Sequence, residues 1–169
     1  NDLVPFVEWM PVFNARHFSG KFPDTLQVPS RGAAASALWQ DAQRMLETLV
    51  RERWLTAQAV LGFFPAAAVS DDVVVFEDAA RVRTVATLHQ LRQQKIKPAG
   101  QPQLCLADFV APLESGVADY IGAFAVTAGI GIESRVAAFE AAHDDYSAIL
   151  LKSQADRLTE ALAEALHLR

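Results

Sequence analysis

Two long stretches of the chain have apolar residues at helical spacing and contain neither proline nor glycine. In the first, from Ala33 to Arg53, apolar side chains recur every three or four positions with charged ones between them. Ser30 stands where the N-cap of this helix is expected. The second runs from Glu133 to about Leu168, and at ~1.5 Å per residue it corresponds to one helix of about 50 Å or to two helices with a bend near Lys152. We therefore predict that residues 134–166 are mostly helical.

Shorter apolar runs between these two stretches predict strands. Ala57–Ala68 and Val73–Phe76 are separated by the turn sequence Ser70-Asp71-Asp72, which predicts an antiparallel hairpin. Three further strand-like runs cover residues 82–88, 104–110 and 119–127. Helices and strands in one chain of this length indicate a single α/β domain.

The run from Ile121 to Val126 has no polar residue in alternation with its apolar ones. This pattern is typical of a strand that is covered on both faces, so we predict a central strand here. We also expect Phe63, Phe124, Phe139 and Ile149 to be buried. On that expectation, Phe124→Ala costs about 3–5 kcal/mol of stability.

The first thirty residues combine prolines with large aromatic side chains. Four prolines prevent one regular helix from running through this segment. Bulky aromatic residues in such a segment predict that it wraps over a core. The prolines are Pro5, Pro11, Pro23 and Pro29, and the large apolar residues are Phe6, Trp9, Phe13, Phe18 and Phe22.

Composition narrows the classes of function. The chain has 169 residues and a net charge of -5 without a cluster of Lys and Arg, which argues against nucleic-acid binding. No apolar run approaches the ~20 residues that span a bilayer, so no membrane partner is expected. Cys105 is the single cysteine and has no internal partner for a disulfide, which favours a reducing, cytoplasmic location. The sequence begins at Asn1, without an initiator Met or a signal pattern, so we expect a piece of a longer polypeptide.

Three acidic residues of the second helical stretch share one helix face. Asp156, Glu160 and Glu164 are four positions apart, and residues at this spacing are neighbours on a helix surface. A cation or a docking partner suits such a face, although an ordinary solvated face is the commoner reason for the pattern.

The same helical stretch contains His143-Asp144-Asp145. A histidine beside carboxylates can bind a metal, but adjacent helical residues point about 100° apart and do not converge on one ion. We therefore favour a capping or interhelical hydrogen bond for His143 and predict no metal site.

Two other segments offer polar candidates. The polar segment His89–Gln94 follows a predicted strand, where residues often line a site, and an ordinary surface turn explains it equally well. Gly129-Ile130-Gly131 lacks the third glycine and the lysine of phosphate-binding loops, so it is interpreted as a strand-to-helix turn. Cys105 has no flanking histidine or basic residue, which favours a buried thiol over a nucleophile. The residues by themselves thus indicate a fold class but no reaction.

Several distinctive strings are spread over nearly the whole chain. They are Glu8–Phe13, Gly20–Pro23, Gly62–Ala66, Leu88–Gln94, Cys105–Pro112, Ala118–Thr127, His143–Tyr146 and Ala155–Leu158. In this number and order they resemble the activation domain of cobalamin-dependent methionine synthase. No single string is a catalytic signature, and the resemblance rests on all of them together.

The resemblance implies a C-shaped α/β (α+β) domain, in which helices flank a twisted antiparallel sheet and a long helix lies at the C-terminal end. It also implies a function as the reactivation module of a methyltransferase, one that binds S-adenosylmethionine and docks on the cobalamin-binding module of the same polypeptide. Flavodoxin or another reductase then supplies an electron, and S-adenosylmethionine remethylates the cobalamin. Such a module holds a methyl donor and needs no catalytic acid or base of its own.

The resemblance assigns S-adenosylmethionine contacts to Glu8 and Glu160, and docking on the cobalamin module to Asp156. Family members commonly have Asp where this chain has Glu8, a change that keeps the charge and lengthens the reach. Carboxylates suit the α-ammonium group or the ribose hydroxyls of the ligand. The family's Arg-x-x-x-Gly-Tyr segment, which also contacts the ligand, does not occur in residues 1–169. We therefore expect a partial activation domain over residues 1–169.

Two alternatives remain open. The chain is either a module that binds S-adenosylmethionine or a docking module of the same fold that no longer binds it. An independent hydrolase that uses Asp71 and Asp72 is the weakest alternative, because adjacent turn residues rarely converge on one substrate.

Overall fold

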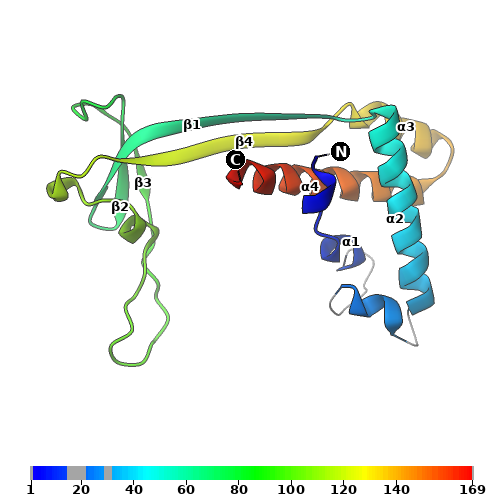
Figure 1. Ribbon diagram of the computed structural model, residues 1–169, viewed down its shortest axis with the longest axis horizontal. Helices are drawn as coiled ribbons and strands as arrows, with labels where there is room; N and C mark the ends of the chain where they lie inside the picture. The colour runs from blue at the N-terminus through cyan, green and yellow to red at the C-terminus, as the bar shows by residue number, and fades with distance from the viewer. Residues whose placement is uncertain (1, 15–21, 29–31, 169) are drawn as a thin grey trace. The chain divides into compact units, whose positions relative to one another are not determined.

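The computed structural model describes residues 2–14, 22–28 and 32–168 (Figure 1). The α-helices are α1 (Met10–Asn14), α2 (Gly32–Glu52), α3 (Ile132–Ala141) and α4 (Asp145–His167), and the strands are β1 (Thr56–Val69), β2 (Asp72–Phe76), β3 (Thr84–His89) and β4 (Asp119–Ile130). Four short 3-10 helices are η1 (Val4–Phe6), η2 (Asp24–Gln27), η3 (Leu106–Phe109) and η4 (Leu113–Ser115). The four strands form one antiparallel sheet, which confirms the predicted α/β class with its long C-terminal helix.

The chain divides into two compact units. Unit 1 comprises Asn1–Ala59 and Val126–Arg169, and unit 2 comprises Val60–Ala125. Among the described residues, no helix is both long and apolar enough to cross a membrane. The expected N-cap at Ser30 and the predicted packing of Phe18 lie outside the described residues.

The core of unit 1 lies between α2, α3 and α4. The apolar stripe of α2 that was predicted from Ala33–Arg53 buries Leu38, Ala42, Leu46 and Leu49. Helix α4 supplies Leu150 to one core cluster and Leu151 and Leu158 to another. Leu151 is fully buried, with 0% of its surface exposed. Burial of these two stripes against each other provides the hydrophobic stabilisation of the unit.

The N-terminal segment packs over this core with its aromatic residues, as predicted. Trp9 meets Trp39 of α2 edge to face, with ring centroids 4.8 Å apart. Phe13, 1% exposed, stacks on Phe22 at 5.5 Å. Such aromatic pairs stabilise a fold beyond the area that they bury. They hold η1 and α1 on the helices, and hence position the segment that carries Glu8.

The predicted helical stretch 134–166 is mostly helical, but it is two helices with the break at residues 142–144 and not near Lys152. Helix α3 ends where His143 adopts a left-handed conformation, with φ 57°. The Asp144 carboxylate then accepts a hydrogen bond from the Ser147 N–H at 3.0 Å and begins α4. The N-cap of α4 is therefore Asp144, whereas His143 lies in the turn after α3, where its backbone N–H donates to the Glu140 carbonyl at 3.0 Å.

Unit 2 contains the predicted hairpin. β1 pairs antiparallel with β2, and Ala66 lies opposite Val75 while Ala68 lies opposite Val73. One face of these strands packs against the segment that contains Cys105 and Ala107, and Cys105 is buried, as expected for a structural thiol. Residues 104–110 were predicted as a strand, but residues 106–109 form η3 because the Asp108 carboxylate caps the Cys105 N–H at 2.8 Å.

The predicted central strand and three of the four predicted core residues are wrong. The sheet order is β3-β2-β1-β4, so β4 is an edge strand among the described residues. Phe63 is 73% exposed, Phe124 46% and Ile149 51%, whereas Phe139 is partly buried against Trp54. An apolar run indicates that a strand can be buried on both faces. It does not indicate whether other elements of the chain pack on those faces. Ile149 is exposed because the break at residues 142–144 resets the phase of the helical stripe.

The buried side of α4 is tested by a matched pair of alanine substitutions. Leu151→Ala is expected to cost about 2–5 kcal/mol of unfolding free energy, because it leaves a cavity in the core. Ile149→Ala, on the exposed side of the same helix, is expected to cost less than about 1 kcal/mol. Urea unfolding of both variants measures the difference, and equal losses would contradict the position of the core. Phe124→Ala is expected to cost less than the predicted ~3–5 kcal/mol, since its side chain is 46% exposed.

Candidate functional site

Glu8 lies in the link between η1 and α1, and its side chain is exposed. The next residue, Trp9, is partly buried and packs against both core clusters of unit 1. The backbone at Glu8 is therefore fixed by its neighbour, while its carboxylate remains accessible to a ligand.

Glu160 lies on α4 and is bound by an arginine of the preceding turn. Two Arg157 N–H groups donate to the two carboxylate oxygens of Glu160, at 2.5 and 2.8 Å. The Arg157 side chain is 14% exposed and that of Glu160 is 61% exposed. A bidentate pair of this kind holds the carboxylate in one orientation. The pairing was missed in the sequence, although the three-residue spacing of Arg157 and Glu160 is a signal for it.

A hydrogen bond beside Glu160 fixes this part of α4. The Thr159 hydroxyl donates to the Ala155 carbonyl at 2.9 Å and accepts from the Ala128 N–H at 3.1 Å. Helix α4 is thus tied to the end of β4 within unit 1, and Glu160 follows the tie directly. Asp156, one turn earlier, is exposed.

The described contacts do not bring the three predicted residues together. Within residues 2–14, 22–28 and 32–168, no hydrogen bond or ion pair joins Glu8 to Glu160 or to Asp156. Of the predicted strand-to-helix turn Gly129–Gly131, the first two residues end β4 and Gly131 alone lies between β4 and α3, with φ 97°. A Cβ at Gly131 would lie 3.1 Å from the Trp54 carbonyl oxygen. Residues 2–14, 22–28 and 32–168 contain no group of three His, Cys, Asp or Glu that could hold a metal ion.

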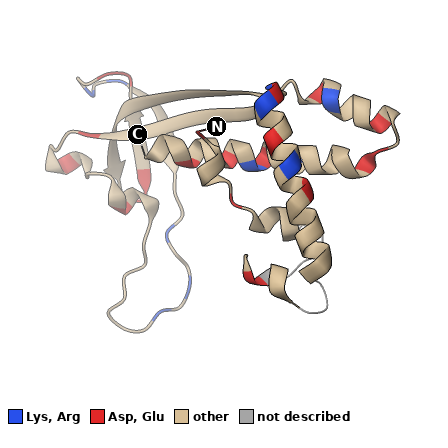
Figure 2. Cartoon of the chain, turned by 45° about the vertical axis from the view of Figure 1, so that its right-hand side comes forward, with Lys and Arg blue, Asp and Glu red and all other residues tan. Residues whose placement is uncertain are grey.

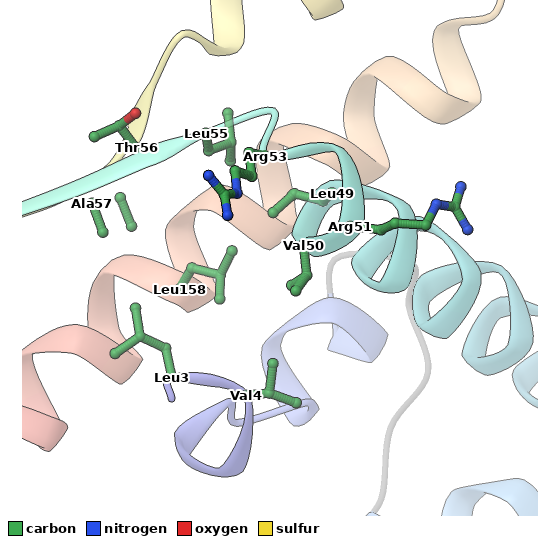
Figure 3. Close-up of a pocket in the computed structure, with 11 residues that line it drawn as sticks. Leu3, Val4, Leu49, Val50, Arg51, Arg53, Leu55, Thr56, Ala57 and Leu158 are labelled. Carbon is green, nitrogen blue, oxygen red and sulfur yellow. The ribbon is translucent and has the colours of Figure 1, made fainter. Parts of the chain in front are cut away.

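Unit 1 also contains a cavity of about 630 Å³ that none of the three residues lines (Figure 3). Its wall is formed mainly by Leu3, Val4, Leu49, Val50, Leu55 and Leu158. Figure 3 shows Arg53 among these side chains, whereas Arg51 extends away from them. Its lining contains the guanidinium groups of Arg51 and Arg53 and no carboxylate.

The polar segment His89–Gln94 in unit 2 is a structural network. The Arg92 guanidinium donates to the carboxylates of Asp71 and Asp108 and to the Gln103 carbonyl, which together use all five of its N–H groups. His89 Nδ1 lies 2.9 Å from an Asp72 carboxylate oxygen. Because Asp71 and Asp72 bind different partners, they do not form the carboxylate pair of a hydrolase. Of the two interpretations of this segment, the contacts favour a surface turn that holds the fold.

Arg92 also shifts the acidity of its partner. Hydrogen bonds from Arg92, and then from the Cys105 N–H, lower the pKa of Asp108 from its ordinary value of 3.8 to about 2. The folded state therefore binds the Asp108 proton more weakly than the unfolded state does.

An acid titration tests this network. The stabilisation from Asp108 is fully present above pH 4 and is lost as the pH falls through about 2, because the unfolded state takes up the proton first. The urea midpoint of the native chain, followed by circular dichroism, is expected to fall over this window. Asp108→Asn should have a lower midpoint at pH 6 and a flatter pH dependence. Glu114→Gln, at an exposed acid of η4 outside the network, is the control, and the same flattening in both variants would contradict the assignment to Asp108.

The fold and these residues define an α/β domain with a helix that carries exposed, oriented carboxylates. Its sequence matches, over residues 1–169, the family described as the activation domain of vitamin B12 dependent methionine synthase. The chain belongs to this family.

A solved structure agrees with the assignment. The chain is similar to a protein whose structure is described as the crystal structure of the MetH reactivation domain bound to AdoHcy, with 46% sequence identity and a TM-score of 0.89. The match covers 99% of this chain and 51% of that chain. This chain therefore spans about half the length of that relative.

Proposed function

We propose that this chain is the reactivation module of a cobalamin-dependent methionine synthase and that it binds S-adenosylmethionine. The observation that carries the proposal is the 46% identity, over 99% of this chain, to a reactivation domain described as bound to AdoHcy. AdoHcy is S-adenosylmethionine without its transferred methyl group, so a site that holds one has the shape to hold the other.

In this proposal the chain holds and orients a methyl donor. Bound S-adenosylmethionine supplies the methyl group to the cobalamin of a partner module, after flavodoxin or another reductase has delivered one electron. The residues of this chain position the donor and dock the two modules. The chain is thus a part of a methyltransferase, and no residue in it is assigned a catalytic role.

Glu160 is proposed to bind the α-ammonium group or a ribose hydroxyl. Its carboxylate offers about four acceptor sites, of which the bidentate pair with Arg157 uses two. The remaining two face a ligand in an orientation that Arg157 has already fixed. This preorganisation lowers the entropic cost of binding.

Glu8 and Asp156 have the two other proposed roles. Glu8 supplies a second carboxylate for the ligand from a backbone that Trp9 anchors. Asp156 lies one turn before Glu160 on the same side of α4 and is exposed, which suits a contact with the cobalamin module. The arginine of the family's Arg-x-x-x-Gly-Tyr segment completes the ligand site in this proposal.

Isothermal titration with S-adenosylmethionine and AdoHcy tests the proposal. The titrated proteins are this chain and a chimera that continues it with the half of the MetH reactivation domain that it does not match. We expect weak or undetectable binding to this chain and measurable binding to the chimera, because each hydrogen bond to a charged group contributes ~1.5–3 kcal/mol. Failure of the chimera to bind either ligand would favour a docking module of the same fold that no longer binds S-adenosylmethionine.

Single substitutions in the chimera then test the residues. Glu160→Gln is expected to weaken binding by about tenfold to a hundredfold, the equivalent of one charge-assisted hydrogen bond. Glu8→Gln should weaken it in the same direction. Glu164→Gln is the matched control, since it removes the same charge one turn further along α4. An equal loss of affinity in Glu164→Gln would show that the loss comes from the change in net charge of α4. Glu160 would then not belong to the ligand site.

A further inference from the structure

Arg53 follows the last residue of α2 in a backbone conformation that favours glycine. Its φ is 52°, and the next residue, Trp54, donates its N–H to the Leu49 carbonyl at 3.1 Å. This hydrogen bond closes the end of α2, at a position where glycine is common because an L side chain with positive φ is strained. Glycine would end α2 without this strain. The arginine at this position therefore indicates a role for its side chain.

The Arg53 guanidinium is also an exception among the basic groups of unit 1. Figure 2 shows basic and acidic residues close together along the helices of this unit. In the described part of unit 1, every other Lys or Arg pairs with a carboxylate or lies over an aromatic ring: Arg44 with Asp41, Arg51 with Glu52, Lys152 with Glu140, Arg157 with Glu160, and Arg135 over Trp54. Within residues 2–14, 22–28 and 32–168, no hydrogen bond, ion pair or ring contact involves the Arg53 guanidinium.

This guanidinium belongs to the wall of the cavity of about 630 Å³ in unit 1. Figure 3 shows Arg53 among the aliphatic side chains of Leu49, Leu55 and Leu158. Arg53 is exposed, so a ligand can reach it from solvent. The other guanidinium of the lining, that of Arg51, extends away and pairs with Glu52 at 3.1 Å. An apolar wall with one polar group that orients the ligand is typical of small-molecule sites of this size.

A single unpaired guanidinium in an aliphatic wall suits one class of ligand. A guanidinium binds a carboxylate through two parallel N–H···O hydrogen bonds, and one charge then balances the other. A phosphate monoester carries nearly two negative charges, and part of this charge would stay uncompensated beside one guanidinium. The aliphatic side chains of the wall suit an apolar body on the same molecule.

We propose that this cavity binds a small carboxylate with an aliphatic body, of the chemical class of a medium-chain fatty acid. The carboxylate accepts two hydrogen bonds from Arg53, and the aliphatic body lies against Leu49, Leu55 and Leu158. Glu8, Asp156 and Glu160 do not line this cavity. The proposal therefore goes beyond the proposed function and does not rest on it.

Isothermal titration of this chain with sodium octanoate tests the site. We expect saturable binding to one site, which Arg53→Gln weakens at least about tenfold because the charge-assisted hydrogen bonds are lost. Arg51→Gln is the matched control, since it makes the same change in a side chain that extends away from the cavity, and it should alter the affinity less than about twofold. Absence of saturable binding, or an equal loss in both variants, would overturn the proposal.

Two changes of ligand test the carboxylate and the aliphatic body separately. Octan-1-ol, which has the same body without the charge, is expected to bind at least about tenfold more weakly than octanoate. Each CH₂ removed from octanoate should weaken binding about fourfold. Equal affinities for octanoate and octan-1-ol would contradict the role of Arg53. Competition by S-adenosylmethionine that Arg53→Gln abolishes would assign the cavity to the ligand of the proposed function, and it would overturn a separate site.

Arg53→Gly distinguishes a ligand contact from support of the helix. A cation near the C-terminal end of a helix can stabilise it, so a structural role predicts a lower thermal midpoint in this variant. Because glycine adopts a positive φ without strain, we expect the thermal midpoint to stay the same or rise while octanoate binding falls at least about tenfold. A lower thermal midpoint together with unchanged octanoate binding would show that Arg53 supports the end of α2, and it would overturn the proposal.

Discussion

The burial of the α4 stripe against α2 is the interaction on which unit 1 depends. Leu151 is fully buried in this contact, and the buried Gln154 side chain donates to the Ala42 carbonyl at 2.6 Å. A buried amide group requires such a partner. This hydrogen bond therefore fixes the position of α4 along α2, in addition to the burial of its apolar side chains. With one side of α4 committed to the core, the residues on its other side are presented to solvent. Asp156 and Glu160 are among them.

Each residue that is proposed to bind the ligand is positioned by a neighbouring residue with more contacts to the rest of the fold. Trp9 anchors the backbone at Glu8, Arg157 orients the Glu160 carboxylate, and Thr159 ties α4 to β4. In unit 2, Arg92 has the same function for the fold, because its five hydrogen bonds connect the β1–β2 turn with η3 and the loop before it. The sequence marked Trp9 as a packing aromatic and Arg92 only as part of the segment His89–Gln94, and it assigned no role to Arg157 or Thr159.

The prediction from sequence succeeded where a signal was local. The helical spacing of 33–53 and the Ser70-Asp71-Asp72 turn identified α2 and the β1–β2 hairpin, because periodicity and turn residues act within a few positions of each other. It failed where the outcome depended on a distant partner. Asp108 caps Cys105 while it binds Arg92, and this pair of contacts converts a strand-like run into η3. The left-handed His143 breaks a stripe that the apolar pattern alone continues.

The sequence by itself determined the α/β class, the helices and the family, since these follow from local periodicity and from the order of many short strings. It also named Glu8, Asp156 and Glu160 as candidates. Only the tertiary structure decided which apolar side chains are covered. Phe63 and Phe124 are large apolar residues like those of the core, yet their side chains are exposed. Burial is a property of two surfaces in contact, and the residues of one strand specify only one of them.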